Sequence, residues 1–164
     1  MTASDLIVTA KTIAEGGFGF RHPLDQSKGC TLSPISRMVG MTACAVNLVR
    51  IAPGEQAFPL HVHHGEEEWT YVVSGTGEVI LDQARHAMRT GDFVAFPPKG
   101  PAHAMVNTGS EDLVCLMGSD LTPTDVIDAP ELGQRIIRYA DRYEAAPMEA
   151  FTSIMPGSNE GESE

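Results

Sequence analysis

The sequence predicts an all-β domain, a sandwich or barrel of short strands. From about residue 43 onward, apolar or alternating runs of four to nine residues are separated by turn residues. The same region lacks the 3.6-residue apolar periodicity of long amphipathic helices. The length of 164 residues matches about one domain, and a hydrophobic content of 42% is enough for a core.

Eight strands are expected, and each ends at a cluster of turn residues. Gly permits positive φ and Pro fixes φ, so clusters such as Pro53-Gly54, Gly75-Thr76-Gly77 and Pro97-Pro98-Lys99-Gly100 reverse the chain. The expected strands span residues 43–51, 57–64, 68–74, 78–81, 86–89, 93–96, 102–107 and 113–117.

The chain divides into four parts by composition. Residues 1–42 are rich in Gly, Ser and Pro and are expected to form an N-terminal arm laid over the barrel, whose core is residues 43–118. Residues 119–155 are a C-terminal extension packing on the barrel, with one modest amphipathic segment at 132–139. Residues 156–164 are small and acidic, which is typical of a disordered tail.

Charge and hydropathy indicate which partners to expect. The formal net charge is −11, and residues 51–164 carry six basic against nineteen acidic side chains, so nucleic acid and anionic membrane surfaces are not expected partners.

The longest apolar run has five residues, far below the ~20 of a membrane span. The first residues lack the features of a secretion signal, which predicts a cytoplasmic protein. The three cysteines are far apart, which predicts reduced thiols.

Five of the six histidines lie between residues 61 and 103. In a strand His61 and His63 point the same way, so their imidazoles form a ready pair of metal ligands. Glu68 opens the next strand, from which a carboxylate can reach the same ion. His103 follows a strong turn and is a plausible fourth donor from another strand.

The spacing of these residues resembles the two sequence motifs of the cupin superfamily. The segment Gly54-x6-His61-x-His63-x4-Glu68-x6-Gly75 is similar to the first motif, and Gly91-x5-Pro97-x2-Gly100-x2-His103-x3-Asn107 to the second. The short stretch between them, residues 76–90, resembles that of small bacterial quercetin-dioxygenase-like cupins. One extra residue precedes His61 and one lies between Pro97 and Gly100, both in predicted loops. The resemblance covers roughly residues 43–118.

This resemblance implies a double-stranded β-helix (a jelly-roll β-barrel) in which one divalent metal ion is held by His61, His63, Glu68 and His103. Such a nitrogen and oxygen donor set accommodates Fe, Mn, Ni, Co, Cu or Zn and does not choose among them. Glu66 and Glu67 are rivals for the carboxylate role, and the motif spacing favours Glu68. His64 is expected on the opposite strand face, and His86 and His22 on the surface.

Strand parity predicts what surrounds the metal. A mostly apolar pocket, suited to a small organic molecule more than to a sugar phosphate, is expected to be lined by Ala57, Pro59, Thr70, Val72 and Met105. Ordinary barrel core is equally compatible with these residues. Arg50 and Arg89 are the only basic candidates nearby. The opposite face carries Trp69, Tyr71 and Val73, which need covering by the arm or by a second subunit; a homodimer is expected.

Several functions are compatible with this pattern. The first hypothesis is a metal-dependent oxygenase acting on a small apolar or aromatic compound, because four protein donors leave room for other ligands on an ion that accepts six. A metal-dependent isomerase or lyase is an alternative, with the ion as a Lewis acid. Others are a sensory cupin that binds a small molecule without turnover, and a fold with a purely structural metal. No catalytic side chain beyond the ligands is singled out.

Overall fold

The structure, a computed structural model, describes residues 3–139 and 142–154, and most of them lie in β-strands. The tail predicted at 156–164 lies outside the described residues. The strands are β1 (Phe18–His22), β2 (Asp25–Ser33), β3 (Cys44–Ile51), β4 (Val62–His63), β5 (Glu68–Ser74), β6 (Thr76–Leu81), β7 (Ala84–Arg89), β8 (Phe93–Phe96), β9 (His103–Val106), β10 (Leu113–Asp120), β11 (Thr124–Ala129), β12 (Gln134–Tyr139) and β13 (Arg142–Pro147). The helical elements are short: η1 (Ala3–Leu6), α1 (Ala10–Glu15), α2 (Ile35–Met38), η2 (Pro130–Leu132) and η3 (Met148–Ala150).

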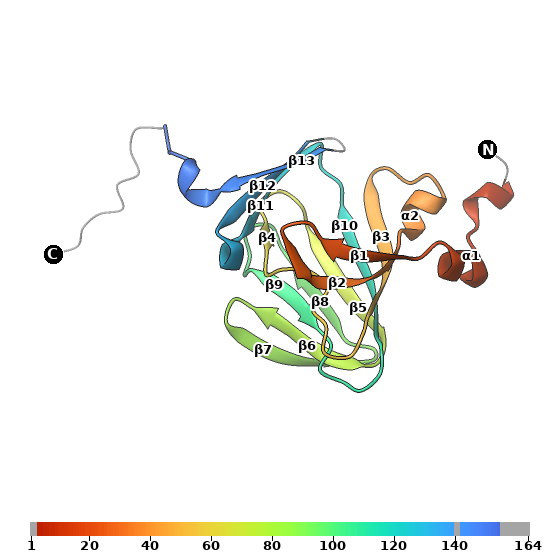
Figure 1. Ribbon diagram of the computed structural model, residues 1–164. Coiled ribbons are helices and arrows are strands. Elements are labelled where there is room, and N and C mark those ends of the chain that lie inside the picture. The colour runs from red at the N-terminus through yellow and green to blue at the C-terminus, as the bar shows by residue number, and fades with distance from the viewer. Residues whose placement is uncertain (1–2, 140–141, 155–164) are drawn as a thin grey trace.

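The described strands form three sheets. Their orders are β1-β2-β3-β10-β5-β8, β13-β12-β11-β4 and β7-β6-β9. Neighbouring strands within each sheet are antiparallel. The β6–β7 hairpin and the strands β12 and β13 lie at opposite ends of the molecule (Figure 1). The predicted all-β class is confirmed.

The expected strand at 57–64 is largely absent. Regular pairing is confined to β4, because the backbone of Ala57 bonds to that of Met105 and the backbone of His61 to that of His103. The chain therefore takes four residues, from Ala57 to His61, to cover the distance that β9 covers in two, from Met105 to His103. The surplus residues, including Pro59, which has no N–H to donate, leave the ladder and face the interior.

The N-terminal segment contributes to the main sheet itself. Strands β1 and β2 form a hairpin, and β2 pairs with β3 through the register Thr31 to Arg50, Leu32 to Val49 and Ser33 to Leu48. Residues 18–33 therefore extend the sheet rather than lying over it as an arm. The amphipathic segment at 132–139 is also a strand for most of its length, β12, which pairs with β11 and β13.

The hydrophobic core joins the six-stranded sheet to the three-stranded sheet. Ile51, Leu113 and Val72 are completely buried, and they pack with Val49, Ala57, Val79, Met88, Phe96, Met105 and Cys115. At the β5–β6 junction, Gly75 has φ +89°, and a Cβ there would lie 2.6 Å from the carbonyl oxygen of Asp112. Only glycine fits this turn, which carries the chain from the first sheet into the third.

The described parts of the chain contain no helix long and apolar enough to cross a membrane. The three cysteines are free thiols. Burial raises the pKa of Cys30 to about 11 and that of Cys115 to about 12. Both thiols therefore stay protonated at neutral pH and are poor nucleophiles.

An apolar stripe lies on the outer face of β5 and β8, as parity predicts. Tyr71, Val73 and Phe93 are 41%, 43% and 61% exposed, and Trp69 stacks on Phe93 with ring centroids 6.1 Å apart. The Trp69 ring also lies across Gly118 on β10, where a Cβ would overlap it. The N-terminal residues that the structure describes leave this stripe exposed, so we expect a second copy of the chain to cover it.

This expectation is tested by the mass of the protein in solution. Light scattering should give the mass of a dimer for the native chain, and Phe93→Lys should shift it to the monomer because a charge would be buried in the interface. Leu6→Lys is the control, since Leu6 is 59% exposed but lies in the N-terminal segment. A native protein that is monomeric at micromolar concentration contradicts the prediction.

Candidate metal centre

Two histidines predicted from different strands lie directly opposite each other. The backbone of His61 donates to the carbonyl of His103 at 3.1 Å, and His103 donates back at 2.7 Å. Residues paired in this way project their side chains to the same face of a sheet. The two imidazole centroids are accordingly 4.5 Å apart.

The turn between Pro97 and Gly100, which is one residue longer than in the family pattern, helps to hold His61 opposite His103. Lys99 adopts φ +59°, and its backbone N–H donates to the carbonyl of His63 at 2.8 Å. The N–H of Gly100 closes the turn on Pro97 at 2.9 Å. The turn before His103 is therefore attached to the strand that carries His63, so the departure from the family spacing leaves the ligands in place.

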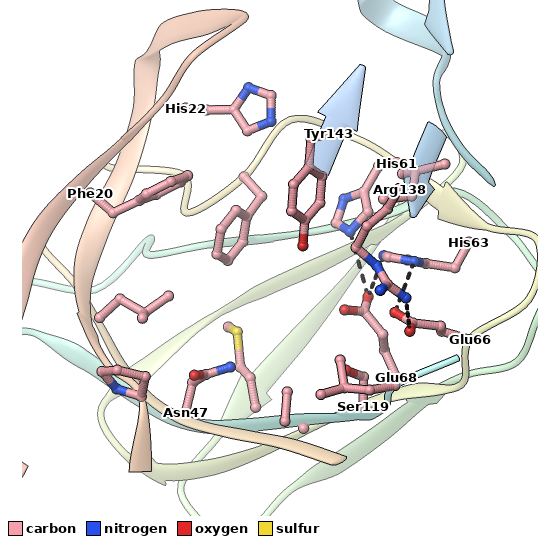
Figure 2. A pocket seen from close by; sticks show the side chains of 18 of the residues that line it. Phe20, His22, Asn47, His61, His63, Glu66, Glu68, Ser119, Arg138 and Tyr143 are labelled. Atoms are coloured by element: carbon pink, nitrogen blue, oxygen red, sulfur yellow. Dashed lines mark hydrogen bonds and ion pairs between the residues drawn. The ribbon is translucent and has the colours of Figure 1, made fainter. Parts of the chain in front are cut away.

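Glu68, the first residue of β5, points its carboxylate into the group of histidines (Figure 2). Its Oε2 lies 2.9 Å from Nε2 of His103, 3.3 Å from Nε2 of His63 and 3.5 Å from Nε2 of His61. One carboxylate oxygen thus faces the same nitrogen of three imidazoles.

The spacing of these atoms suits a single transition-metal ion. Donor atoms of His61, His63 and Glu68 all lie within 4.8 Å of one another. With metal–nitrogen bonds of about 2.1 Å, two ligand atoms on one ion are at most about 4.2 Å apart, so small side-chain movements would suffice. His103 contacts this group through Glu68, while its ring centroid is 6.4 Å from that of His63.

The three imidazoles are held to different degrees. Nδ1 of His61 bonds to the carbonyl oxygen of Pro59 at 2.9 Å, and Nδ1 of His63 bonds to Oδ2 of Asp125 at 2.5 Å. Because both partners are acceptors, these Nδ1 atoms carry a proton, so that in each neutral imidazole Nε2 is the nitrogen left to bind a metal ion. Nδ1 of His103 is buried without a hydrogen-bond partner among the described residues, and its ring stacks on Phe96 at 3.8 Å.

Burial and hydrogen bonding act in opposite directions on the pKa values of this cluster. Burial alone would raise the pKa of Glu68, but hydrogen bonds from His103 and His61 hold it well below its usual value. Burial would lower the pKa of His61, yet the Glu68 carboxylate raises it. Burial dominates at His103 and lowers its pKa. Glu68 is therefore ionised at neutral pH.

The two rival carboxylates have other surroundings than Glu68. Glu67 is exposed, while Glu66 is buried beside Arg138 on β12, and the N–H of Thr122 donates to it at 2.8 Å. Glu66 does lie near Nδ1 of His63, at 3.9 Å, so His63, Glu66 and Asp125 form a second, fully buried group of possible donors. Glu66 also lines the cavity, but Arg138 already compensates its charge, and it is Glu68 whose carboxylate faces the Nε2 atoms of the three imidazoles.

The cluster opens into a cavity of about 1090 Å³. Pro59, Thr70 and Met105 line it, as predicted. Ala57 and Val72 instead have no exposed surface and pack in the hydrophobic core, so the parity argument placed these two wrongly. Arg50 and Arg89 do not line the cavity; Arg37 and Arg138 do.

Of the other three histidines, two lie where the sequence predicts and one does not. His64 lies outside the cluster, as expected, with Nε2 2.9 Å from Oδ2 of Asp128. His86 on β7 is exposed. His22 was expected on the surface but is half-buried and lines the cavity, where burial lowers its pKa. It reaches the cavity because β1 joins the sheet instead of lying outside it.

Several cavity residues have no signal in the sequence. Phe20 on β1 and Tyr143 on β13 project into the cavity from opposite sides (Figure 2), and Phe58 lies between β1 and the histidines, 5.5 Å from Phe20 and 6.3 Å from His61 between ring centroids. Arg138 and Asp125 come from the C-terminal strands. These residues lie outside the two motifs or in the irregular segment before His61, so only the fold reveals them.

Comparison with known proteins supports the same architecture. The sequence profile of the cupin domain matches residues 47–118. The crystal structure of a "Putative sugar phosphate isomerase" from Acidithiobacillus ferrooxidans is 30% identical, with a TM-score of 0.88 over 94% of this chain and 99% of that chain. A sugar phosphate isomerase of the cupin superfamily from Silicibacter pomeroyi is 25% identical, with a TM-score of 0.74 over 86% and 92%.

A curated relative is matched over a shorter stretch. The protein SchB of Streptomyces halstedii is 37% identical over 70 residues, which is 43% of this chain and 49% of SchB, so the match spans about half of that relative. The double-stranded β-helix is thus confirmed by structural similarity across nearly the whole chain, and the profile match coincides with both histidine motifs. The chain belongs to the cupin superfamily.

Proposed function

We propose that this protein is a metal-dependent enzyme whose divalent transition-metal ion is bound by His61, His63, Glu68 and His103. One observation carries the proposal: Oε2 of Glu68 lies within 3.5 Å of Nε2 of all three imidazoles, at the wall of a cavity of about 1090 Å³. Four donors on one side of an open cavity leave coordination positions for a substrate, whereas a structural metal site is closed by protein ligands.

The preferred substrate class is a small apolar or aromatic compound. The rings of Phe20, Phe58 and Tyr143 border the approach to the histidines and offer flat apolar surface. Near the cluster Arg138 is occupied by Glu66 and by the carbonyl oxygen of Thr122, so it contributes little net positive charge. A weakly charged compound therefore fits this wall better than a polyanion.

Within this class we favour an oxygenase reaction. When bound, an Fe, Mn or Ni ion would supply redox chemistry with O₂, and a Zn ion would supply Lewis-acid chemistry. The chain's own residues would orient the substrate: the apolar walls hold its carbon skeleton, and two neighbouring substrate oxygens are directed toward the imidazoles. The phenol of Tyr143, which projects into the cavity, is placed to hydrogen-bond a polar group of the substrate.

A second candidate is an isomerase acting on a phosphorylated sugar. It is favoured by the 30% identity to the Acidithiobacillus ferrooxidans structure, whose name carries that activity, over 94% of this chain. Arg37 lines the cavity from α2 and is exposed, so a phosphate group could contact it while the sugar reaches the histidines. The apolar walls argue against this candidate.

One assay separates the candidates. The protein is loaded separately with Fe²⁺, Mn²⁺, Ni²⁺ and Zn²⁺, and oxygen uptake is measured with catechols and diketones. Anaerobic samples are followed by NMR for conversion of aldose phosphates to ketose phosphates. Oxygen uptake supports the oxygenase, isomerisation without oxygen supports the second candidate, and binding without any product contradicts both in favour of a sensory role.

The ligand assignment is tested in the same assay. His61→Ala should abolish turnover, because it removes an imidazole that faces Glu68. His64→Ala is the matched control: this neighbouring histidine bonds to Asp128 and should leave turnover intact. Full activity of His61→Ala would exclude the metal from the mechanism.

A further inference from the structure

The strands that follow the cupin-domain match reach back into the candidate metal centre. The match ends at residue 118, and β11 begins at Thr124. From β11, Asp125 places its Oδ2 2.5 Å from Nδ1 of His63, and its side chain has no exposed surface. Its other oxygen, Oδ1, accepts the backbone N–H of Gly65 at 2.8 Å. Both carboxylate oxygens are therefore engaged.

Among the described residues, the side chain that bonds to Nδ1 of His63 is that of Asp125. The other carboxylate beside this nitrogen, Oε2 of Glu66, lies 3.9 Å away, beyond hydrogen-bond distance. Glu66 is itself held by Arg138 and by the backbone N–H of Thr122. Within the described part of the chain, the imidazole of His63 is the one oriented through Nδ1 by a side chain. Nδ1 of His61 bonds to a backbone carbonyl, and Nδ1 of His103 has no hydrogen-bond partner there.

We propose that Asp125 is a positioning residue for the metal centre: it holds the proton of His63 on Nδ1 and turns the Nε2 lone pair toward Glu68 and the ion. This inference rests on the proposed metal-binding function. A carboxylate on the far nitrogen of a ligating histidine fixes its orientation and tautomer and raises its basicity. The C-terminal strands are then part of the metal site, although no ligand comes from them.

Asp125→Asn gives a test whose direction the geometry sets. The N–H of Gly65 needs an acceptor, so the amide oxygen of the asparagine would take the place of Oδ1, and its NH₂ group would face His63. An NH₂ group donates to Nδ1 and forces the imidazole proton onto Nε2, the atom that must bind the metal. Asp125→Ala removes both contacts and leaves the tautomer open.

The two variants therefore separate positioning from simple structural support. A positioning role predicts that Asp125→Asn weakens Zn²⁺ and Co²⁺ binding by about 10- to 100-fold and more than Asp125→Ala does. A structural role predicts the reverse order, because asparagine keeps the shape and the bond to Gly65. Asp128→Asn is the matched control, since Asp128 on the same strand holds His64 at 2.9 Å and Arg135 instead of a ligand.

The experiment combines two measurements on the full chain. Dissociation constants for Zn²⁺ and Co²⁺ are obtained by competition with a chelator, and ¹⁵N NMR of the metal-free protein at alkaline pH reports which nitrogen of His63 is protonated. We expect Nδ1–H in the native protein and in Asp128→Asn, and Nε2–H in Asp125→Asn. Native affinity and an unchanged tautomer in Asp125→Asn overturn the inference. Failure of the native chain to bind metal would instead overturn the proposed function, while the tautomer still decides the role of Asp125.

Discussion

Metal binding should raise the melting temperature of this protein, and Glu68→Ala should abolish the rise. A ligand that binds only the folded state at about 1,000 times its Kd stabilises it by about 4 kcal/mol. For a chain of this size about 1 kcal/mol corresponds to about 2–4 °C, so the expected rise is about 8–16 °C. Glu68→Ala removes the carboxylate that faces all three imidazoles. Differential scanning calorimetry of chelated and metal-loaded samples measures both values.

Glu67→Ala is the control for this experiment. Glu67 is the neighbouring carboxylate and is exposed. Its bonds to Asp120 come from the backbone: its N–H donates to Oδ1 of Asp120, and its carbonyl accepts the N–H of Asp120. The variant should keep the full metal-dependent rise. An equal rise in Glu68→Ala, or no rise in the native protein, would contradict the assignment of Glu68 as a ligand.

Asn107→Ala should destabilise the fold by about 2–5 kcal/mol without affecting the metal centre. Asn107 has no exposed surface, and its Nδ2 donates to the carbonyl oxygens of Ile51 at 2.7 Å and Glu111 at 2.8 Å. Its Oδ1 accepts the N–H of Gly109 at 2.9 Å. Alanine leaves the carbonyl of Ile51 unpaired in the interior, at about 1–3 kcal/mol, and removes two part-buried hydrogen bonds, at about 0.5–1.5 kcal/mol each. Urea unfolding of the metal-free protein measures the loss.

Two further variants test whether the side-chain hydrogen bonds of Asn107 cause this loss of stability. Asn107→Asp keeps the acceptor for Gly109 but turns a charged oxygen toward two carbonyls, so it should be at least as destabilising as alanine. Glu111→Ala should change stability by less than about 0.5 kcal/mol, because Glu111 contributes only its backbone carbonyl. A loss below about 1 kcal/mol for Asn107→Ala would show that the motif asparagine does not brace this loop.

Strands with regular alternation between turn residues could be predicted closely from the sequence. The expected strands at 68–74 and 93–96 coincide with β5 and β8. The strand at 57–64 could not, because its bulge depends on pairing with β9, a long-range contact that no local pattern records. Long-range pairing also decides the structure of residues 132–139. Their two adjacent isoleucines, Ile136 and Ile137, show no strict alternation, yet pairing with β11 and β13 makes most of the segment a strand.

The candidate centre could be located from the sequence, and its surroundings only in part. The spacing of His61, His63, Glu68 and His103 predicts four donors for one ion. The structure brings their side chains together from β4, β5, β9 and the segment before β4. The supporting residues come from β1, which lies far before His61 in the sequence, and from β11, β12 and β13, which lie far after it. None of these strands carries a motif. Asp125 in particular looks like any acidic surface residue until β11 is seen pairing with β4.

The most direct test of the account is the metal content of the protein purified without chelator. Inductively coupled plasma mass spectrometry should find about one transition-metal ion per chain in the native protein. His103→Ala should lose it, because His103 comes from β9 and reaches the cluster from the opposite strand. A native chain without metal, or a His103→Ala chain that retains it fully, would contradict the claim that these four residues share one ion.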